Sequence, residues 1–326
     1  MRFATLKDTQ PDGRLHLVSR DNTRCAPTQG VETMQALLEN WDAHNADLQE
    51  QSHKLNSGPV AGEKPLLCAE ALAPLPRAWQ WLDGSAFASH GALMEKAFKH
   101  KAANPSGLPL MYQGISDRFL SPQEDAVFPS EADDIDFEGE FGIVTDRVPA
   151  GTSAEAALPH IRLLVQINDW SLRRLAPIEI ATGFGFIQCK PRSSMAPVAV
   201  TPDELGSAWA DGRIHLPLAV ELNGQHFGHP NGGSMSVGFH DLVAHAAYSR
   251  DLVAGTVIGS GTVSNDEWAE VGSTCMTERR MTEMILEGAP QTPFLRFGDR
   301  VRMEARLPDA PLFGAIDQIV ATQPSD

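Results

Sequence analysis

Two glutamates stand one residue apart in the run Asp136-Phe-Glu-Gly-Glu-Phe-Gly-Ile-Val144, where they could bind a cation. If the run is a strand, its alternating side chains place Glu138 and Glu140 on one face, about 7 Å apart, with apolar side chains on the other face. The alternative is a solvated face of an edge strand, which is the commoner setting for an isolated pair of this kind. The run alone leaves both interpretations open.

A third acid, Asp169, follows an apolar run at residues 161–167 that is typical of a buried strand. A carboxylate at the tip of such a strand either forms a turn with its own backbone or points into a cleft as a ligand. A fourth acid, Asp83, precedes a predicted helix over residues 85–101, and His90 lies two helical turns further along the same face. Asp83 could equally be the N-cap of that helix, and His90 an ordinary surface histidine.

Carboxylates that converge on one point repel one another strongly unless a cation lies between them. Oxygen ligands alone favour a hard cation, so a shared site would bind Mg²⁺, Ca²⁺ or Mn²⁺ rather than Zn²⁺. A divalent cation is therefore the cofactor that we expect.

Together these segments resemble the fumarylacetoacetate hydrolase family. The family's strand motif with two glutamates is matched by the run at residues 136–144, and its asparagine-aspartate-tryptophan-serine motif by Asn168-Asp-Trp-Ser171. Further matching segments follow in the family's order across roughly residues 80–305: Leu108-Pro-Leu-Met-Tyr-Gln-Gly114, Lys190-Pro-Arg-Ser-Ser-Met-Ala-Pro197, Gly259-Ser-Gly-Thr-Val-Ser264 and Phe294-Leu-Arg-Phe-Gly-Asp299. The resemblance implies a mixed β-sheet roll as the catalytic body, often dimeric, behind a small N-terminal domain.

The resemblance also implies roles for single residues. The cation ligands would be the four carboxylates Asp83, Glu138, Glu140 and Asp169. His90 would be the general base that activates water, and Glu278 is the candidate for the carboxylate that orients it. Lys190 and Thr262 would lie near the substrate oxygens, and Tyr112 would contact the far end of the substrate.

Three positions differ from the animal fumarylacetoacetases and bear on the substrate. Ser85 and Lys99 stand where those enzymes carry tyrosine and arginine, and Ala176 stands near a family glutamine. Lys99 keeps a positive charge but lacks the planar fork that grips a carboxylate with two hydrogen bonds. We expect Lys99 and Tyr112 to anchor the terminal carboxylate of an acidic diketo acid.

These residue types suit hydrolysis of a C–C bond. Two oxygens of a β-diketo acid can chelate one cation, which polarises the carbonyl and stabilises the departing enolate. A histidine can take a proton from water near neutral pH, and Lys190 could donate to the developing oxyanion or be a surface lysine that neutralises the acidic cluster. We predict a metal-dependent, fumarylacetoacetase-like hydrolase of aromatic compound catabolism, such as tyrosine degradation, with fumarylacetoacetate as its substrate.

Other functions stay open. Within the family they are an acylpyruvate or fumarylpyruvate hydrolase and a 2-oxo acid decarboxylase or hydratase with the same metal centre. From another class, the alternative is a non-catalytic homologue that keeps the ion as a structural element. The presence of His90 beside four carboxylates favours catalysis, because a structural cation needs no base.

Short strands must position these residues, because β-rich runs outnumber helical patterns and the two do not alternate regularly. We expect strands over residues 3–7, 14–18, 137–145, 161–168, 216–222, 256–259 and 301–305, and helices over 33–55, 85–101 and 236–250. This pattern favours an antiparallel or mixed α+β fold over a doubly wound sheet. A stretch rich in Pro, Gly and Ala at residues 56–76 predicts a small N-terminal domain over 1–72 and a catalytic domain over 73–326.

Composition excludes several classes of protein. The chain has 326 residues, of which 42 are acidic and 26 basic, and its net charge of −16 argues against a nucleic-acid partner. The four cysteines are far apart and suggest neither a disulfide framework nor a zinc motif. No stretch approaches the ~20 apolar residues of a membrane span, and no apolar signal segment begins the sequence. We expect a cytoplasmic homodimer that acts on a small diketo acid.

Overall fold

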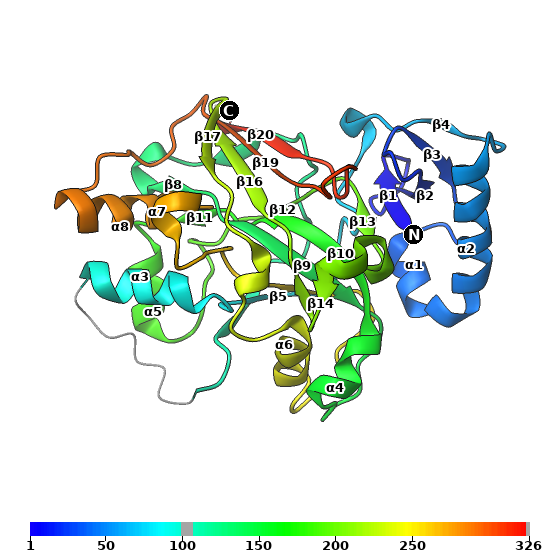
Figure 1. Cartoon of the computed structure of the whole chain (residues 1–326), viewed down its shortest axis with the longest axis horizontal. Helices are drawn as coiled ribbons and strands as arrows, with labels where there is room; N and C mark the ends of the chain where they lie inside the picture. Colours follow the sequence, from blue (N-terminus) through cyan, green and yellow to red (C-terminus); the bar gives the residue numbers. More distant parts are fainter. Residues whose placement is uncertain (99–106, 324–326) are drawn as a thin grey trace.

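The computed structural model describes residues 1–98 and 107–323, and a large mixed β-sheet runs through it (Figure 1). Eleven strands of the described ranges form this sheet. Ten of them lie in the order β4 (Lys64–Pro65), β3 (Arg24–Pro27), β2 (Arg14–Val18), β1 (Arg2–Leu6), β13 (Ala199–Val200), β10 (Ile161–Asn168), β9 (Gly139–Thr145), β18 (Thr256–Gly259), β5 (Gln80–Gly84) and β6 (Met111–Gly114), and β12 (Ser194–Met195) pairs with β10. β18 is parallel to β5 and antiparallel to β9.

A second sheet has the order β17 (Gln225–Gly228), β16 (Leu218–Leu222), β19 (Arg300–Ala305), β20 (Ile316–Thr322) and β7 (Ala126–Phe128). Two short pairs join β8 (Ile135–Asp136) to β11 (Ser171–Leu172) and β14 (Trp209–Ala210) to β15 (Arg213–Ile214). The α-helices are α1 (Met34–Glu39), α2 (Trp41–Ser57), α3 (Ala88–Phe98), α4 (Ala154–Ala157), α5 (Ala176–Thr182), α6 (Phe239–Ala246), α7 (Trp268–Val271) and α8 (Met276–Glu287). Within the described ranges, no helix has the length and apolar character needed to cross a membrane.

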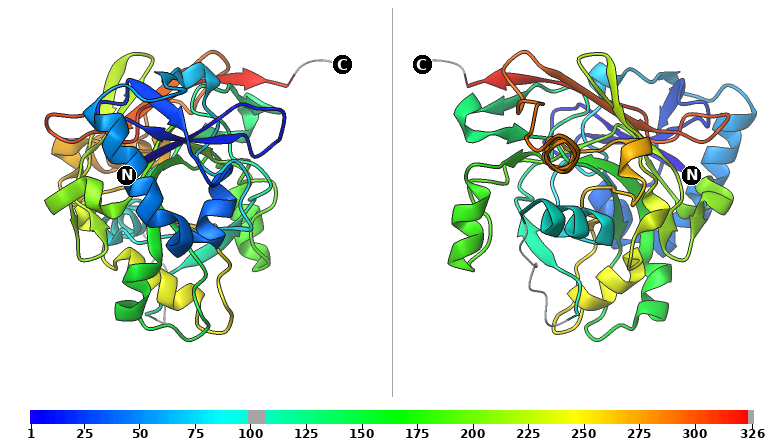
Figure 2. Two further views of the ribbon diagram at one scale, coloured as in Figure 1. Left: turned by 90° about the vertical axis from the view of Figure 1, so that its right-hand side faces the viewer. Right: turned by 60° about the vertical axis from the view of Figure 1, so that its left-hand side comes forward.

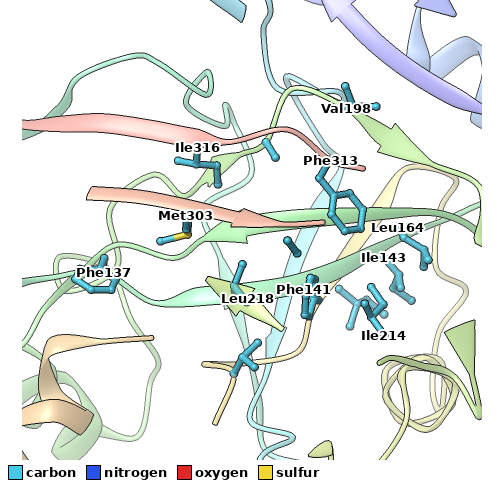
Figure 3. Packing of buried hydrophobic residues seen from close by; sticks show 14 of the residues in the cluster. Phe137, Phe141, Ile143, Leu164, Val198, Ile214, Leu218, Met303, Phe313 and Ile316 are labelled. Carbon is cyan, nitrogen blue, oxygen red and sulfur yellow. The ribbon is translucent and has the colours of Figure 1, made fainter. Parts of the chain in front are cut away.

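The hydrophobic core is divided into two clusters by strands β9 and β10. Successive side chains of a strand point to opposite faces. Ile143 therefore packs between the two sheets, with Leu218 and Met303 of the second sheet (Figure 3). Val144 and Leu163 point to the other face and join the cluster that extends to the N-terminal elements. Sheet and core together form the mixed β-rich α+β fold that the sequence predicts.

The N-terminal strands extend the large sheet. β1 and β2 lie close to the strands predicted over residues 3–7 and 14–18 and form a hairpin, and β1 pairs in turn with β13. Helix α2 packs on β2, and its Leu48 belongs to the same cluster as Val144 and Leu163. Figures 1 and 2 show α1 and α2 at one end of the molecule, with α8 at the opposite end. The predicted helix over 33–55 is split at Asn40, whose backbone leaves the helical region with φ −132°.

Two local expectations are wrong. Asp83 does not begin a helix: it lies in β5, where it pairs with Gly259 on one side and Tyr112 on the other, and α3 begins five residues later, at Ala88. The strand predicted from residue 137 begins at Gly139 instead, because the preceding β8 pairs with β11 outside the large sheet. In both cases pairing with distant strands decides the backbone conformation.

Candidate active site

Three carboxylates from neighbouring strands meet in the interior. Asp83 on β5, Glu140 on β9 and Asp169 just after β10 each offer an oxygen, and these oxygens lie within 4.8 Å of one another. All three side chains are buried. The strand between β5 and β9 contributes Gly259 at this point, and a Cβ there would lie 2.4 Å from Asp83 Oδ1 and 2.8 Å from Glu140 Oε2. The absence of a side chain at Gly259 leaves the space in which the carboxylates converge.

Two members of this group, Asp83 and Glu140, have little to compensate a negative charge. No donor among the described residues reaches either oxygen of Glu140, and Asp83 Oδ1 accepts one hydrogen bond from the backbone N–H of Gly261, at 3.2 Å. Burial and the charge of Asp169 raise the pKa of Asp83 to about 8. Burial, Asp83 and Asp169 raise the pKa of Glu140 well above its usual range. Buried oxygen ligands without partners suit a hard divalent cation.

Glu138 lies beside this group but has partners of its own. Its Oε1 accepts hydrogen bonds from Ser171 Oγ at 2.5 Å and from Lys190 Nζ at 2.7 Å, and Arg173 Nη2 lies 2.9 Å away. Its Oε2 accepts from Thr262 Oγ1 at 2.5 Å. Although burial favours the neutral acid, Arg173 and Lys190 hold the pKa of Glu138 well below its usual range. Glu138 is therefore an ionised, fully bonded carboxylate, unlike Glu140.

Asp169 links the acidic group to two residues expected near the substrate. Its Oδ2 accepts from Tyr112 Oη at 2.6 Å and from Lys190 Nζ, and its Oδ1 accepts from Ser193 Oγ at 2.6 Å. The Lys190 side chain is 11% exposed, which excludes the surface-lysine interpretation. Burial opposes its charge, but Asp169 and Glu138 raise the pKa of Lys190. The hydroxyl of Tyr112 thus lies against the acidic group, and its expected contact with the far end of the substrate stays a prediction.

His90 and Glu278 come together from two helices that pack on each other, α3 and α8. His90 Nδ1 lies 3.6 Å from Glu278 Oε1, which accepts a hydrogen bond from Ser264 Oγ at 2.5 Å. His90 Nδ1 and Glu278 Oε2 are both buried and have no hydrogen-bond partner among the described residues. A carboxylate that accepts from Nδ1 leaves Nε2 as the basic nitrogen.

A cavity of about 690 Å³ opens onto both groups. Its polar lining includes Asp83, His90, Glu138, Lys190 and Thr262, together with Ser85, Tyr112 and Arg173. Phe87, Leu110, Met111, Ile180 and Phe186 supply apolar walls. Lys99, expected to read a terminal carboxylate, lies outside the described residues.

Two family models match almost the whole chain. Residues 80–321 match the family described as Fumarylacetoacetate (FAA) hydrolase C-terminal, and residues 1–77 match Fumarylacetoacetase N-terminal domain 2. The chain belongs to the fumarylacetoacetate hydrolase family. No curated protein sequence matches it significantly.

Solved structures share the family's fold at low identity. Maleylpyruvate hydrolase from Sphingobium sp. SYK-6, in complex with manganese(II) ion and pyruvate, has a TM-score of 0.66 and 15% identity over 99% of this chain and 100% of its own. The 5-carboxymethyl-2-hydroxymuconate delta-isomerase from Mycobacterium smegmatis has a TM-score of 0.62 and 17% identity, and covers 100% of both chains. The 2-hydroxyhepta-2,4-diene-1,7-dioate isomerase from Mycobacterium marinum has the same TM-score, identity and coverage. At these identities the likeness shows the fold alone.

Sequence reasoning missed several residues of this family site. Arg173 lines the cavity and contacts Glu138, and Ser193 bonds Asp169, yet neither was singled out. Arg173 follows the motif at 168–171 by two residues, and Ser193 lies within the segment that begins at Lys190. The cationic side chain of Arg173 and the hydroxyl of Ser193, so close to these motifs, are the sequence signals that point to a role in the site.

Proposed function

We propose that this protein is a metal-dependent hydrolase that cleaves a C–C bond in a β-diketo acid. The observation that carries the proposal is a single cavity lined by both His90 and Asp83 of the buried acidic group, with Glu278 behind the histidine. A structural cation alone would not need a histidine–glutamate pair.

The cation would be held by Asp83, Glu140 and Asp169. Their buried oxygens, two of them without partners on Glu140, support this choice, and so does the manganese in the related maleylpyruvate hydrolase. Glu138, the fourth ligand expected from the sequence, would have to exchange a hydrogen bond for the ion. A bound Mg²⁺, Ca²⁺ or Mn²⁺ would polarise the substrate carbonyl.

The chain's own residues would handle protons and orientation. His90 Nε2 takes a proton from water, while Glu278 holds the ring through Nδ1 and stabilises the imidazolium that results. Lys190 and Thr262 both line the cavity. Lys190 donates two N–H groups to Glu138 and Asp169 and has a third for a substrate oxygen, whereas Thr262 would have to give up its bond to Glu138 in order to donate. Arg173 adds a cation that suits the substrate's carboxylate.

Fumarylacetoacetate is the substrate that we propose, with an acylpyruvate or fumarylpyruvate as the alternative within the same chemistry. A cavity of about 690 Å³ is large enough for either, since small-ligand sites span about 300–1,000 Å³. The cytoplasmic setting, the role in aromatic catabolism, the homodimer and a domain boundary near residue 72 are further parts of this proposal. They follow from the family resemblance, the charge and the cysteine pattern.

The test is turnover of a panel of diketo acids, followed by loss of enol absorbance, with and without Mg²⁺ or Mn²⁺. We expect metal-dependent cleavage of at least one compound, and cleavage slower by a factor on the order of 10²–10⁴ by His90→Ala. Decarboxylation or hydration instead of cleavage would favour the other reactions of the family. Metal binding without any turnover would favour the alternative of a non-catalytic homologue.

A further inference from the structure

Asp136 is a fully buried carboxylate to which the proposed chemistry gives no part. Its Oδ1 accepts a hydrogen bond from the backbone N–H of Met276 at 2.7 Å. Its Oδ2 accepts from the backbone N–H of Thr277 at 3.0 Å, from Thr277 Oγ1 at 2.7 Å and from Arg173 Nε at 2.7 Å. One carboxylate thus joins the start of α8 to an arginine of the cavity wall.

The contacts with α8 fix the first turn of that helix. The first N–H groups of a helix have no partner within it, and a negative charge there is favourable. The carboxylate of Asp136 accepts hydrogen bonds from the first two of these N–H groups, those of Met276 and Thr277. The Sγ of Cys275 accepts from the third, that of Glu278, at 3.2 Å. Because Glu278 is the third residue of α8, the position of Asp136 sets where its carboxylate lies relative to His90.

The contact with Arg173 fixes the guanidinium. Arg173 lies between two carboxylates, with Nε 2.7 Å from Asp136 and Nη2 2.9 Å from Glu138. The hydrogen bond from Nε to Asp136 orients the planar guanidinium, and the charge of Glu138 attracts Nη2 without a hydrogen bond. Asp136 itself is held opposite Ser171 in the short β8–β11 pair, and Ser171 bonds the same oxygen of Glu138 that Arg173 contacts.

We propose that Asp136 is a positioning residue that aligns Arg173 toward the substrate's carboxylate and Glu278 toward His90 at the same time. This inference rests on the proposed function for its kinetic consequences. The competing explanation is a helix cap that contributes only to stability.

The main test is Asp136→Asn, which keeps the size of the side chain but turns one acceptor into a donor. In one orientation the amide NH₂ faces the N–H of Met276, and in the other it faces Thr277 and Arg173, so a donor meets a donor either way. With Mn²⁺-loaded protein and the best substrate of the panel, we expect kcat/KM per folded molecule to fall on the order of 10- to 100-fold. Mn²⁺ affinity should change by less than about 3-fold, because Asp136 is outside the group of three carboxylates.

Double-mutant cycles separate positioning from stability. If Asp136 acts through Arg173 and Glu278, Asp136→Asn should cost far less in the Arg173→Lys and Glu278→Gln backgrounds than in the wild type. Thr277→Val removes one bond of the α8 side and leaves Arg173 untouched, so it should lower kcat with KM unchanged. Thr277→Val can be measured even if Asp136→Asn does not fold.

Pyruvate binding to the Mn²⁺-loaded protein gives a readout without turnover. Arg173→Lys and Asp136→Asn should each weaken it about 10-fold, and the double variant no further. The inference would be overturned if Asp136→Asn were less stable but kept the kcat/KM and pyruvate affinity of the wild type. It would also be overturned if the fold-changes of the single variants multiplied in every double variant. Pyruvate binding with these expected losses but no wild-type turnover would refute only the proposed function. A wild type that neither binds pyruvate nor turns over any substrate would refute both the inference and the proposed function.

Discussion

Glu140 is a buried carboxylate whose oxygens receive no hydrogen bond from the residues that the structure describes, and Asp83 and Asp169 lie beside it. Burial and these neighbours raise the pKa of Glu140 and bring that of Asp83 to about 8, against an unfolded value of 3.8. Between these two pH values Asp83 and Glu140 therefore bind more protons in the folded protein without metal than in the unfolded chain. Their contribution to stability falls as pH rises from about 4 to about 8.

We predict that the metal-free protein melts at progressively lower temperature between pH 5 and pH 8, and that Mn²⁺ removes most of this loss. Thermal melts across this pH range, with EDTA or Mn²⁺, measure the effect. Glu140→Gln should flatten the pH dependence and abolish the stabilisation by Mn²⁺, because it removes one charge and one ligand. A metal-free wild type whose stability rises over this range would contradict the prediction.

Asp169→Asn should abolish activity and most of the metal stabilisation. The amide offers one oxygen where the carboxylate offered two, and it also loses the charge that pairs with Lys190. Melting temperatures with and without Mg²⁺ or Mn²⁺ check the result. Asp117→Asn is a matched control, because Asp117 is a half-exposed aspartate paired with Arg192 outside the cavity. Equal metal stabilisation of the wild type and Asp169→Asn would remove Asp169 from the ligand set.

His90→Ala should lower kcat by a factor on the order of 10²–10⁴ with Mn²⁺ affinity nearly unchanged. The reason is that His90 faces Glu278 on α8, while the three converging oxygens belong to Asp83, Glu140 and Asp169. Isothermal titration and steady-state kinetics separate the two effects, with the exposed His226→Ala as control. A large loss of metal affinity would make His90 a ligand instead.

At the scale of an element, α5 and the loop after it depend on Glu179. Its carboxylate accepts hydrogen bonds from the backbone N–H groups of Ile187, Gln188 and Cys189, at 3.1, 2.9 and 3.1 Å. Burial opposes ionisation, yet bonds from Cys189 and its neighbours lower the pKa of Glu179 to about 2. The loop held in this way carries Phe186, which lines the cavity and packs edge-on against Tyr112 at 4.9 Å.

Glu179→Ala should therefore raise KM, on the order of 10-fold, more than it lowers kcat. Loss of three charge-assisted hydrogen bonds frees the loop that forms the cavity wall, while His90 and the acidic group keep their places. Steady-state kinetics on the best substrate of the panel measure both constants. Glu155→Ala, on exposed α4, is the control. A fall in kcat alone would show that the loop acts in the chemical step.

At the scale of the whole molecule, large apolar side chains are exposed at the rim of the cavity. Phe184 is 98% exposed and Ile187 is 83% exposed, on the segment that follows α5, and Ile178 and Ile180 on α5 are more than half exposed. Contiguous apolar surface of this kind is typical of interfaces. It supports the proposed homodimer, with this segment as the contact surface.

Light scattering should give the mass of two chains for the wild type and a shift toward one chain for Phe184→Asp. A buried charge without a partner opposes association. Tyr248→Asp changes another aromatic residue, 83% exposed and beyond α6, and should leave the mass unchanged. A wild type that is monomeric at micromolar concentration would contradict the homodimer.

Several features of this protein could be predicted from the sequence by itself. The β1–β2 hairpin, strand β10 and strand β18 lie where turn residues and short apolar runs place them, since these signals report local backbone preference. The family was also recognisable, because its motifs are short segments kept in order along the chain. The acids at 83, 140 and 169 could thus be named together before their distances were known.

Only the tertiary structure decided how those acids meet. Asp83 lies in a strand because β5 pairs with β18, which is more than 170 residues away in sequence, and no local pattern encodes that pairing. The same pairing brings Gly259 between Asp83 and Glu140, while Glu138 leaves the strand and is neutralised by Lys190 and Arg173. Side-chain periodicity describes one strand at a time. The convergence of charges depends instead on which strands are neighbours, and long-range pairing and packing determine that order.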